Sequence, residues 1–533
     1  MKTFAQLSFF GAKRTRIRSH EGTVGEAGSI TPGVGGPKPN RRRGRLRVIF
    51  FHLAAIVVVL SPLVLGELVL RLCIPRPPLG LDDPYVSFSS QRPLFVLDST
   101  STRFDTAENR LTYFCPQSFA AAKGSETFRV FCLGGSTVQG RPYSIETSFT
   151  TWLKLNLRAA RPGADYEVVN CGGVSYATYR LVPIMRELLA YEPDLFIIYT
   201  GHNEFLEDRT YRRLKRTPRA LIRLHQVMLK LRSYGLAHQF LSQRRAQRTD
   251  PGGSSKTVLP TEVQAKLDFR DGLESYHRDQ TWRQGTIEHF GRNLETMVQM
   301  SRDAGVPLIL VNPVSNLKDC PPFKSESRTD LSERQTQRVL ELRERAGKLD
   351  WADAYGKLKL LEQAAALDSR HAELLYLIGK CYEHIGRSTE AKNWFVLAKE
   401  EDVCPLRILE PMHDAILDVA ARYDVPLVDV KVLIKERTED GVPGDEWLLD
   451  HVHLSVAGHQ LIADSLYQTM EDMELVRTPQ DWWATREELW QRHLSSLNEA
   501  YFARGLARLK WLHEWSRGPM PDGLACPSDS TKD

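Results

Sequence analysis

The chain has 533 residues, of which 42% are hydrophobic and 26% charged, so its composition is that of a globular protein with room for two or three domains. Its eight cysteines are too sparse for a disulfide scaffold and include no Cys-x-x-Cys pair of the kind that binds zinc. The net charge of +5 is unevenly distributed: residues 1–47 contain eleven Lys or Arg and two Glu, a charge of +9, which leaves −4 for the remainder. Basic character is therefore confined to the N-terminal tail.

The N-terminal tail precedes an uncharged apolar segment. Residues 1–47 are rich in Gly, Pro, Ser and Arg without apolar periodicity, so we expect a disordered tail. The segment VIFFHLAAIVVVLSPLVLG (48–66) covers about 28 Å as a helix, close to the thickness of a bilayer. We expect a single transmembrane helix over 48–70 rather than a buried globular helix. Because basic flanks stay inside, the tail would be cytoplasmic and the bulk of the chain extracytoplasmic.

Processing of this segment is disfavoured, since no small-x-small cleavage site precedes Glu67 and Cys73 lacks the small-residue setting of a lipoprotein site. The interpretation is therefore an uncleaved signal anchor that contacts the lipid bilayer. A membrane-anchored chain with its positive charge in the tail also argues against nucleic-acid binding.

Short apolar runs and amphipathic segments alternate through the rest of the chain. The runs have the unalternating composition of strands covered on both faces, and they lie at 128–133, 166–171, 194–200, 306–312 and 425–430. Helical patterns separate them at 148–160, 179–193 and 290–305. This alternation predicts an α/β fold with a parallel sheet and helices on both faces, in which ligands bind at the carboxyl ends of the strands.

Two insertions interrupt this pattern. Residues 206–285 mix basic and apolar residues and are predicted to be a helical insertion or lid, with contact to anionic lipid headgroups as an alternative. Within 331–403, small and aromatic residues have the spacing of a tetratricopeptide repeat: Gly379, Tyr382, Gly386, Ala391, Phe395 and Ala398. About one and a half repeats resemble that family, too few to stand alone, so we expect this insert to pack on the sheet domain, with binding of a protein partner as a further role left open. Residues 476–533 form a C-terminal helical extension.

Small or polar residues follow the first three predicted strands. The strands end at Gly134-Gly135-Ser136-Thr137, at Asn170-Cys171-Gly172-Gly173 and at Gly201-His202-Asn203-Glu204, and Asp450 and His453 lie near the C-terminus. In a parallel sheet these points meet at one edge. They fit acyl transfer from an ester, because a serine nucleophile needs a histidine base, a carboxylate to orient it, and donors such as Gly172 and Asn203 for the oxyanion.

With these four blocks the chain resembles the SGNH (GDSL-type) hydrolase family from about Arg129 to Met470. The resemblance implies a flavodoxin-like three-layer α/β/α fold whose core comprises 74–205, 286–330 and 404–475. It implies a Ser136–His453–Asp450 triad and an oxyanion hole formed by Ser136, Gly172 and Asn203. Two positions depart from the family pattern: Gly135 replaces the acidic residue of the GDSL block, and Glu204 the final Asp of the third block.

Further residues are candidates for lining a substrate cleft: Gly135, His202, Glu204, Asn316 and Asp319. For Asn316 and Asp319, a role in capping their loop is an equal alternative. A metal site formed by Asp450, His451, His453 and His459 is a weaker alternative, because it would leave the Ser136 block unexplained. No metal or other cofactor is expected.

The favoured function is a membrane-anchored serine esterase that hydrolyses O-acyl esters, most simply O-acetyl esters, of a carbohydrate or cell-envelope compound. An O-acetyltransferase would use the same triad but deliver the acyl group to a sugar hydroxyl, and the sequence does not separate the two. A non-catalytic envelope assembly protein, which would bind a partner through the repeat-like insert, is the alternative from a different class.

Overall fold

The computed structural model describes residues 51–52, 58, 61–62, 64–72, 93–207, 228, 231–234, 263, 265–268 and 272–516. The expected disordered tail 1–47, 11 of the 23 residues of the expected transmembrane helix 48–70, most of the 206–285 insertion and the chain after 516 lie outside these ranges. Within the described ranges, no helix combines the length and apolarity needed to span a bilayer. The chain divides into two units at Leu68/Val69, and the second unit, Val69–Asp533, contains the strands and the candidate site.

A five-stranded parallel sheet forms the centre of this unit. Its strands, in chain order, are β4 (Thr127–Gly134), β5 (Asp165–Gly172), β6 (Leu195–Tyr199), β7 (Leu308–Asn312) and β8 (Leu427–Asp429). Their spatial order is β5-β4-β6-β7-β8, and every neighbouring pair is parallel. Numbered along the chain this is the flavodoxin-like order 2-1-3-4-5. The direction of the strand order reverses between the neighbouring strands β4 and β6, which is the switch point of the sheet. The parallel α/β architecture expected from the sequence is confirmed.

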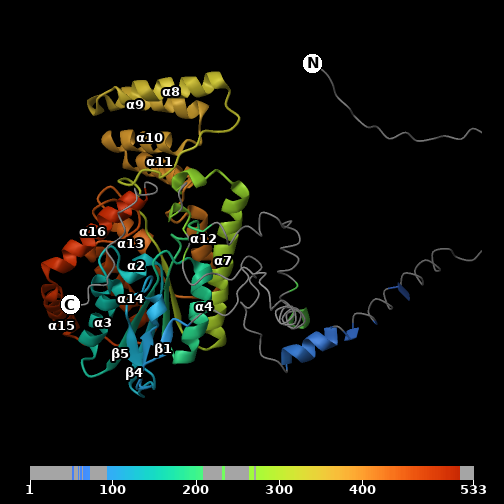
Figure 1. Cartoon of the computed structure of the whole chain (residues 1–533), viewed down its shortest axis with the longest axis vertical. Helices are drawn as coiled ribbons and strands as arrows, with labels where there is room; N and C mark the ends of the chain where they lie inside the picture. The colour runs from blue at the N-terminus through green and yellow to red at the C-terminus, as the bar shows by residue number, and fades with distance from the viewer. Residues whose placement is uncertain are drawn as a thin grey trace, which may run out of the picture. The chain divides into compact units, whose positions relative to one another are not determined.

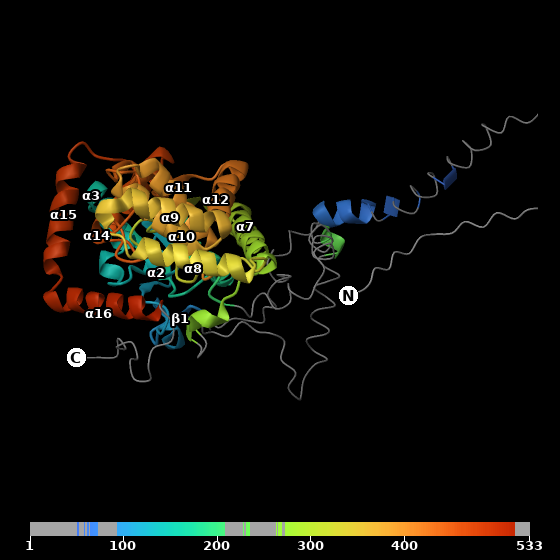
Figure 2. The ribbon, with the colours of Figure 1, turned by 90° about the horizontal axis from the view of Figure 1, so that it is seen from above.

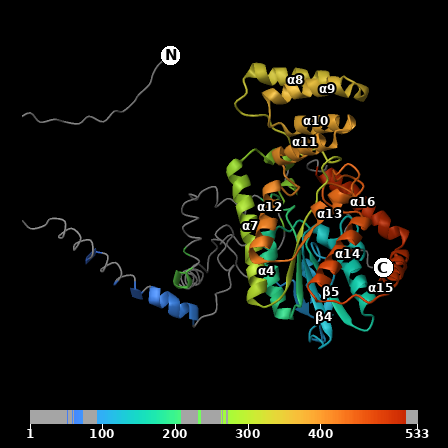
Figure 3. The same cartoon turned by 180° about the vertical axis from the view of Figure 1, so that it is seen from behind.

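Helices cover both faces of the sheet (Figure 3). Alternate residues of β4 point to opposite sides, Phe131 and Leu133 to one core and Val130 and Cys132 to the other. The first core is completed by α4 (Thr178–Leu188), α7 (Gln280–Asp303) and α12 (Glu410–Tyr423). The second is completed by α3 (Phe149–Ala160), α13 (Val430–Arg437) and α14 (Val456–Asp472). Because both faces are buried, the strands read as continuous apolar runs.

Two of the expected helices have different bounds. The helix expected over 290–305 begins earlier, at Gln280, because the Asp279 carboxylate accepts a hydrogen bond from the backbone N–H of Trp282 at 2.9 Å. The helix expected over 179–193 ends at Leu188 and continues as a 3₁₀ turn, Leu189–Tyr191. The other 3₁₀ turns in the described ranges are Glu108–Arg110, Ile145–Thr147, Lys266–Asp268, Gly272–Ser275 and Trp351–Asp353.

A small antiparallel sheet precedes the main one and was not predicted. It consists of β1 (Phe95–Leu97), β2 (Arg103–Thr106) and β3 (Ser118–Ala120). These strands are too short for a recognisable alternation. The buried Arg129 of β4 joins the two sheets, because its guanidinium donates to Glu167 of β5 at 2.6 Å and to the carbonyl of Ala120 at 2.8 Å.

The 331–403 insert consists of four helices, which lie over the core in Figures 1 and 2. They are α8 (Glu333–Gly347), α9 (Ala354–Leu367), α10 (Ala372–His384) and α11 (Ser388–Glu401). The insert therefore contains two helix pairs where one and a half were expected. The additional helix, α8, was not expected because it is strongly polar and buries few apolar side chains. Gly379 lets α10 approach α11, since a Cβ there would lie 2.6 Å from the Phe395 ring. Tyr376 ties the insert to the core through its hydroxyl, which donates to the carbonyl of Lys318 at 2.7 Å.

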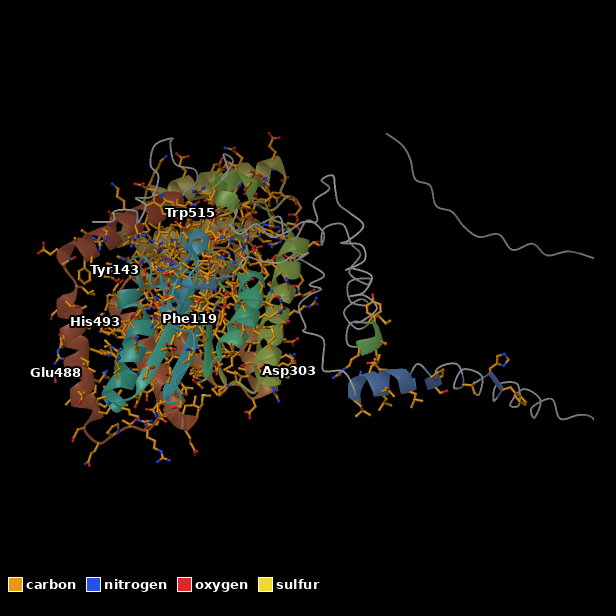
Figure 4. All side chains as sticks on the ribbon, turned by 60° about the horizontal axis from the view of Figure 1, so that its bottom comes forward. Phe119, Tyr143, Asp303, Glu488, His493 and Trp515 are labelled. Atoms are coloured by element: carbon orange, nitrogen blue, oxygen red, sulfur yellow. The ribbon has the colours of Figure 1, made fainter. Side chains whose placement is uncertain are left out.

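The C-terminal extension forms α15 (Trp482–Ser496) and α16 (Glu499–Trp515), which carry His493 and Trp515 in Figure 4. Helix α15 packs on α3, where Trp490 donates to Asn156 at 2.9 Å. Helix α16 packs on the loop that follows α2 (Ser136–Gln139): the Tyr501 and Thr147 hydroxyls lie 2.8 Å apart. Helix α16 thus packs over a loop near the start of the sheet domain.

Candidate active site

The candidate nucleophile Ser136 is the first residue of α2, directly after the central strand β4. Gly134 and Gly135 make this turn possible. A Cβ at Gly134 would lie 2.1 Å from the carbonyl of Tyr199, and a Cβ at Gly135 would lie 2.5 Å from the side-chain nitrogen of Asn203. The two glycines therefore let Ser136 emerge at the carboxyl edge of the sheet beside Asn203.

Ser136, His453 and Asp450 form one continuous hydrogen-bonded chain. His453 Nε2 lies 2.7 Å from Ser136 Oγ, and His453 Nδ1 lies 2.6 Å from Asp450 Oδ2. An ionised Asp450 can only accept, so the proton between these two side chains is on Nδ1. Nε2 is then free to accept from the serine hydroxyl. The structure brings together the three residues that the resemblance implied, although Ser136 is far from the other two in the sequence.

The local backbone orients the Asp450 carboxylate. Its Oδ1 accepts from the backbone N–H groups of Val452 at 2.9 Å and His453 at 2.8 Å. Burial alone would raise the pKa of Asp450, but the charges of His453 and His451 and these hydrogen bonds lower it overall. Asp450 therefore remains ionised and holds the imidazole in one orientation.

Two donors are available to an oxyanion at Ser136. Its own backbone N–H belongs to the first turn of α2 and has no helical partner. The Asn203 amide uses one N–H to donate to the carbonyl of Tyr176 at 3.1 Å, and its second N–H forms no hydrogen bond within the described part of the chain.

Gly172 differs from the role that the resemblance implied. Its backbone N–H donates to the Asn170 side chain at 3.0 Å, so it is already occupied. What Gly172 provides is space, because a Cβ there would lie 2.3 Å from the backbone nitrogen of Gln139. Asn170 was not singled out in the sequence, although an amide two residues before a glycine pair at a strand end was a usable signal. Its own amide also donates to the carbonyl of Val138 at 2.6 Å, so Asn170 fixes α2 against β5.

Glu204, a predicted cleft residue, is fully buried behind the site. Its carboxylate accepts from the backbone N–H and the hydroxyl of Thr178, both at 2.8 Å, and so caps the start of α4, whose own N-cap residue Ala177 has no capping side chain. Burial raises the pKa of Glu204 to about 7, against the lowering effect of the Thr178 hydrogen bonds. The prediction that Glu204 lines the cleft is wrong.

His202, a second predicted cleft residue, is also buried. Its Nδ1 accepts from the backbone N–H of Ile408 at 3.3 Å, and its Nε2 has no hydrogen-bond partner in the part of the chain that the structure describes. Burial, followed by the neighbouring His451 and His453, holds the pKa of His202 well below its usual range. His202 is therefore a neutral imidazole packed close to the triad.

Asn316 and Asp319 support the loop that carries the triad histidine. The backbone N–H of Asn316 donates to the carbonyl of His451 at 3.0 Å, and its side-chain amide donates to Asp445 at 2.8 Å. Asp319 accepts from the backbone N–H of Asp445 at 3.0 Å. Of the two roles left open for these residues, the structure favours the loop-capping one. Arg407, which the sequence analysis did not single out, also stabilises this loop, because its guanidinium donates to the carbonyl of Asn316 at 2.9 Å.

The alternative metal site is not assembled. His459 accepts from the backbone N–H of Phe149 at 3.3 Å and stacks on its ring, while His451 Nδ1 lies 3.6 Å from Asp450 Oδ1 and its ring contacts Phe323. Among the described residues, no group of three or more His, Cys, Asp or Glu is placed to hold a metal ion.

Comparisons with known proteins give only distant likenesses. No family model and no curated protein matches the chain. The lipase/acylhydrolase from Enterococcus faecalis is 13% identical with a TM-score of 0.30, over 66% of this chain and 99% of that one. The acetylxylan esterase Axe2 from Geobacillus stearothermophilus is 12% identical with a TM-score of 0.28, over 66% and 96% of the respective chains. The alpha/beta hydrolase enzyme LAE5, from the metagenome of Lake Arreo, is 14% identical with a TM-score of 0.28, over 66% and 97%. At these values, the interpretation of the site rests on its own geometry.

Proposed function

We propose that the protein is a serine hydrolase of SGNH type that acts on carboxylic esters. The observation that carries this proposal is the hydrogen-bonded chain from Ser136 Oγ to His453 at 2.7 Å and on to Asp450 at 2.6 Å. A hydroxyl, an imidazole and an ionised carboxylate in this order are the groups needed to make and break an acyl-serine ester.

In the proposed reaction each of these residues has a step. His453 Nε2 takes the proton of Ser136 as Oγ attacks the ester carbonyl, and Asp450 stabilises the imidazolium that forms. Negative charge then develops on the carbonyl oxygen, where the N–H of Ser136 and the second N–H of Asn203 stabilise it. His453 returns the proton to the leaving alkoxide, and a water molecule activated by the same imidazole hydrolyses the acyl-enzyme.

The proposal extends to the class of substrate. We infer O-acyl, most simply O-acetyl, esters of a carbohydrate or cell-envelope compound. The support is the +9 tail followed by an uncharged segment long enough to span a bilayer, which favours an anchored enzyme with its catalytic domain outside the cytoplasm.

The test is esterase activity of the full-length chain in detergent, with p-nitrophenyl acetate as substrate. Ser136→Ala removes one oxygen from a strand end, so it should leave the melting temperature nearly unchanged and lower activity by several orders of magnitude. The matched control is Ser332→Ala, which removes another serine from a helix start, the N-cap of α8, and should retain full activity. Equal turnover by wild type and folded Ser136→Ala would refute the proposal.

A further inference from the structure

A concave site separate from the triad lies between the insert and the sheet domain. It is a pocket of about 240 Å³ at the carboxyl ends of β7 and β8, bordered by helices α11, α12 and α13, which are labelled in Figures 1 and 3. The triad residues do not line it. Four lysines do: Lys392 and Lys399 from α11, and Lys431 and Lys435 from α13. Spacings of seven and four residues place each pair on one face of its helix, so both helices direct two cations at the same cavity.

Two of these lysines share one carboxylate. Glu410, at the start of α12, accepts from Lys399 Nζ at 2.8 Å and from Lys431 Nζ at 2.5 Å. Burial works against the charge of Glu410, but the two ammonium groups outweigh it and lower the pKa of Glu410 to about 2. The side chain of Lys399 is only 2% exposed and also donates to the carbonyl of Ile408 at 2.8 Å. The Lys399–Glu410–Lys431 group is therefore a fixed part of the pocket wall.

The other two lysines, Lys392 and Lys435, have no carboxylate partner among the described residues. Lys392 is half-buried and Lys435 exposed, and neither forms an ion pair with a carboxylate in the described ranges. Burial, and then the charges of Lys435 and Lys431, lower the pKa of Lys392. The pocket has two further carboxylates: Asp429 is engaged by Asn312 and by the N-terminus of α13, and Asp414 is exposed on α12. In the described part of the protein, neither of these carboxylates forms an ion pair with Lys392 or Lys435, so both ammonium groups are open to an added anion.

We propose that this pocket binds a compact ligand carrying an oxyanion, either a phosphate or a carboxylate group. An oxyanion between Lys392 and Lys435 would relieve their mutual repulsion and receive charge-assisted hydrogen bonds from both. The volume corresponds to about eight water molecules at ~30 Å³ each, enough for a small sugar acid or sugar phosphate. Apolar side chains such as Val314, Leu317 and Leu417 form the rest of the wall and suit the body of such a ligand.

The pocket shares a loop with the catalytic site. Val314, Ser315 and Leu317 line the pocket, and Asn316 between them holds the carbonyl of His451. A ligand would therefore join the insert, through Lys392, to the loop that supports the triad. This gives the insert a role in ligand binding that does not depend on a protein partner.

The test is isothermal titration calorimetry of the full-length protein with sodium phosphate and, separately, with glucuronate, at constant ionic strength. Neutral glucose is the ligand control. Saturable binding of phosphate or glucuronate should be weakened at least about tenfold in Lys392→Gln/Lys435→Gln. The ligand that binds more tightly identifies which oxyanion the pocket prefers.

Two further variants make the outcome decisive. Lys348→Gln/Lys359→Gln removes the same charge from the α8–α9 end of the insert and should bind as wild type does. Lys392→Arg/Lys435→Arg keeps the charge and should retain binding, which separates loss of charge from loss of fold. The proposal is overturned if wild type shows no saturable binding, or if the Gln pair at 392 and 435 binds as tightly as wild type.

Discussion

Asn203 offers a test that separates catalysis from stability, because its two N–H groups have different partners. One N–H donates to the carbonyl of Tyr176 at 3.1 Å, and the other is available to an oxyanion at Ser136. Asn203→Ala removes both. Loss of the first should cost about 1 kcal/mol of the free energy of unfolding. Loss of the second should raise the activation barrier by about 2.7–4 kcal/mol, a fall of 10²–10³ in kcat, with little change in KM.

The measurements are kcat and KM with p-nitrophenyl acetate, together with the melting temperature of each variant. Asn203→Asp keeps the size of the side chain but not its donors, so it should also lose activity. Asn156→Ala is the matched control, since this buried amide in α3 donates to Asp464 at 3.0 Å, away from the triad. It should lower the melting temperature and leave kcat unchanged. A normal kcat in Asn203→Ala with a lowered melting temperature would refute the oxyanion role.

Three other predictions rest on the same geometry and on the sequence. Gly135→Ala places a Cβ 2.5 Å from the Asn203 amide nitrogen, so it should displace that donor and lower kcat by about 10²; unchanged kcat would contradict this placement. Glu204 has a pKa raised from its ordinary 4.5 to about 7, so its stabilising contribution is complete below pH 4.5 and is lost as the pH rises through 7. The free energy of unfolding of wild type minus that of Glu204→Gln, both measured by urea titration, should fall by ~3 kcal/mol between pH 4.5 and 8. A difference that stays constant over this pH range would contradict the raised pKa of Glu204. Reporter fusions after Leu81 should be active only for reporters that work outside the cytoplasm, and the reverse pattern would reject the proposed topology.

The sequence predicted the parts of the molecule that depend on local pattern. The five parallel strands were recognisable because both faces of the sheet are buried, which makes each strand a continuous apolar run. The convergence of Ser136, Asn203 and His453 at the carboxyl edge was predictable from parallel topology and from the family resemblance.

The parts that were missed depend on contacts between distant residues. Whether the Gly172 N–H is free depends on the side-chain rotamer of Asn170, because that side chain accepts its hydrogen bond. The spacing of residues in the sequence does not predict a rotamer. Glu204 looks like a cleft residue in the sequence, yet it turns inward because α4 lacks a capping side chain of its own. Helix α8 was overlooked because it is strongly polar overall and buries only Val339, Leu342 and Ala346 among its described side chains.

The separation of Ser136 from His453 along the chain, 317 residues, also determines when the catalytic site can form. At about 5–20 residues per second, a ribosome needs roughly 15–60 s to travel from the nucleophile to its base. Throughout that interval the nascent chain carries an unactivated serine, since neither the imidazole nor the carboxylate exists yet. Helix α16 is made later still and closes on Thr147 near the beginning of the sheet domain. The proposed ester hydrolysis thus requires that synthesis has passed His453, and a product that stops before Asp450 lacks both the carboxylate and the imidazole of the triad.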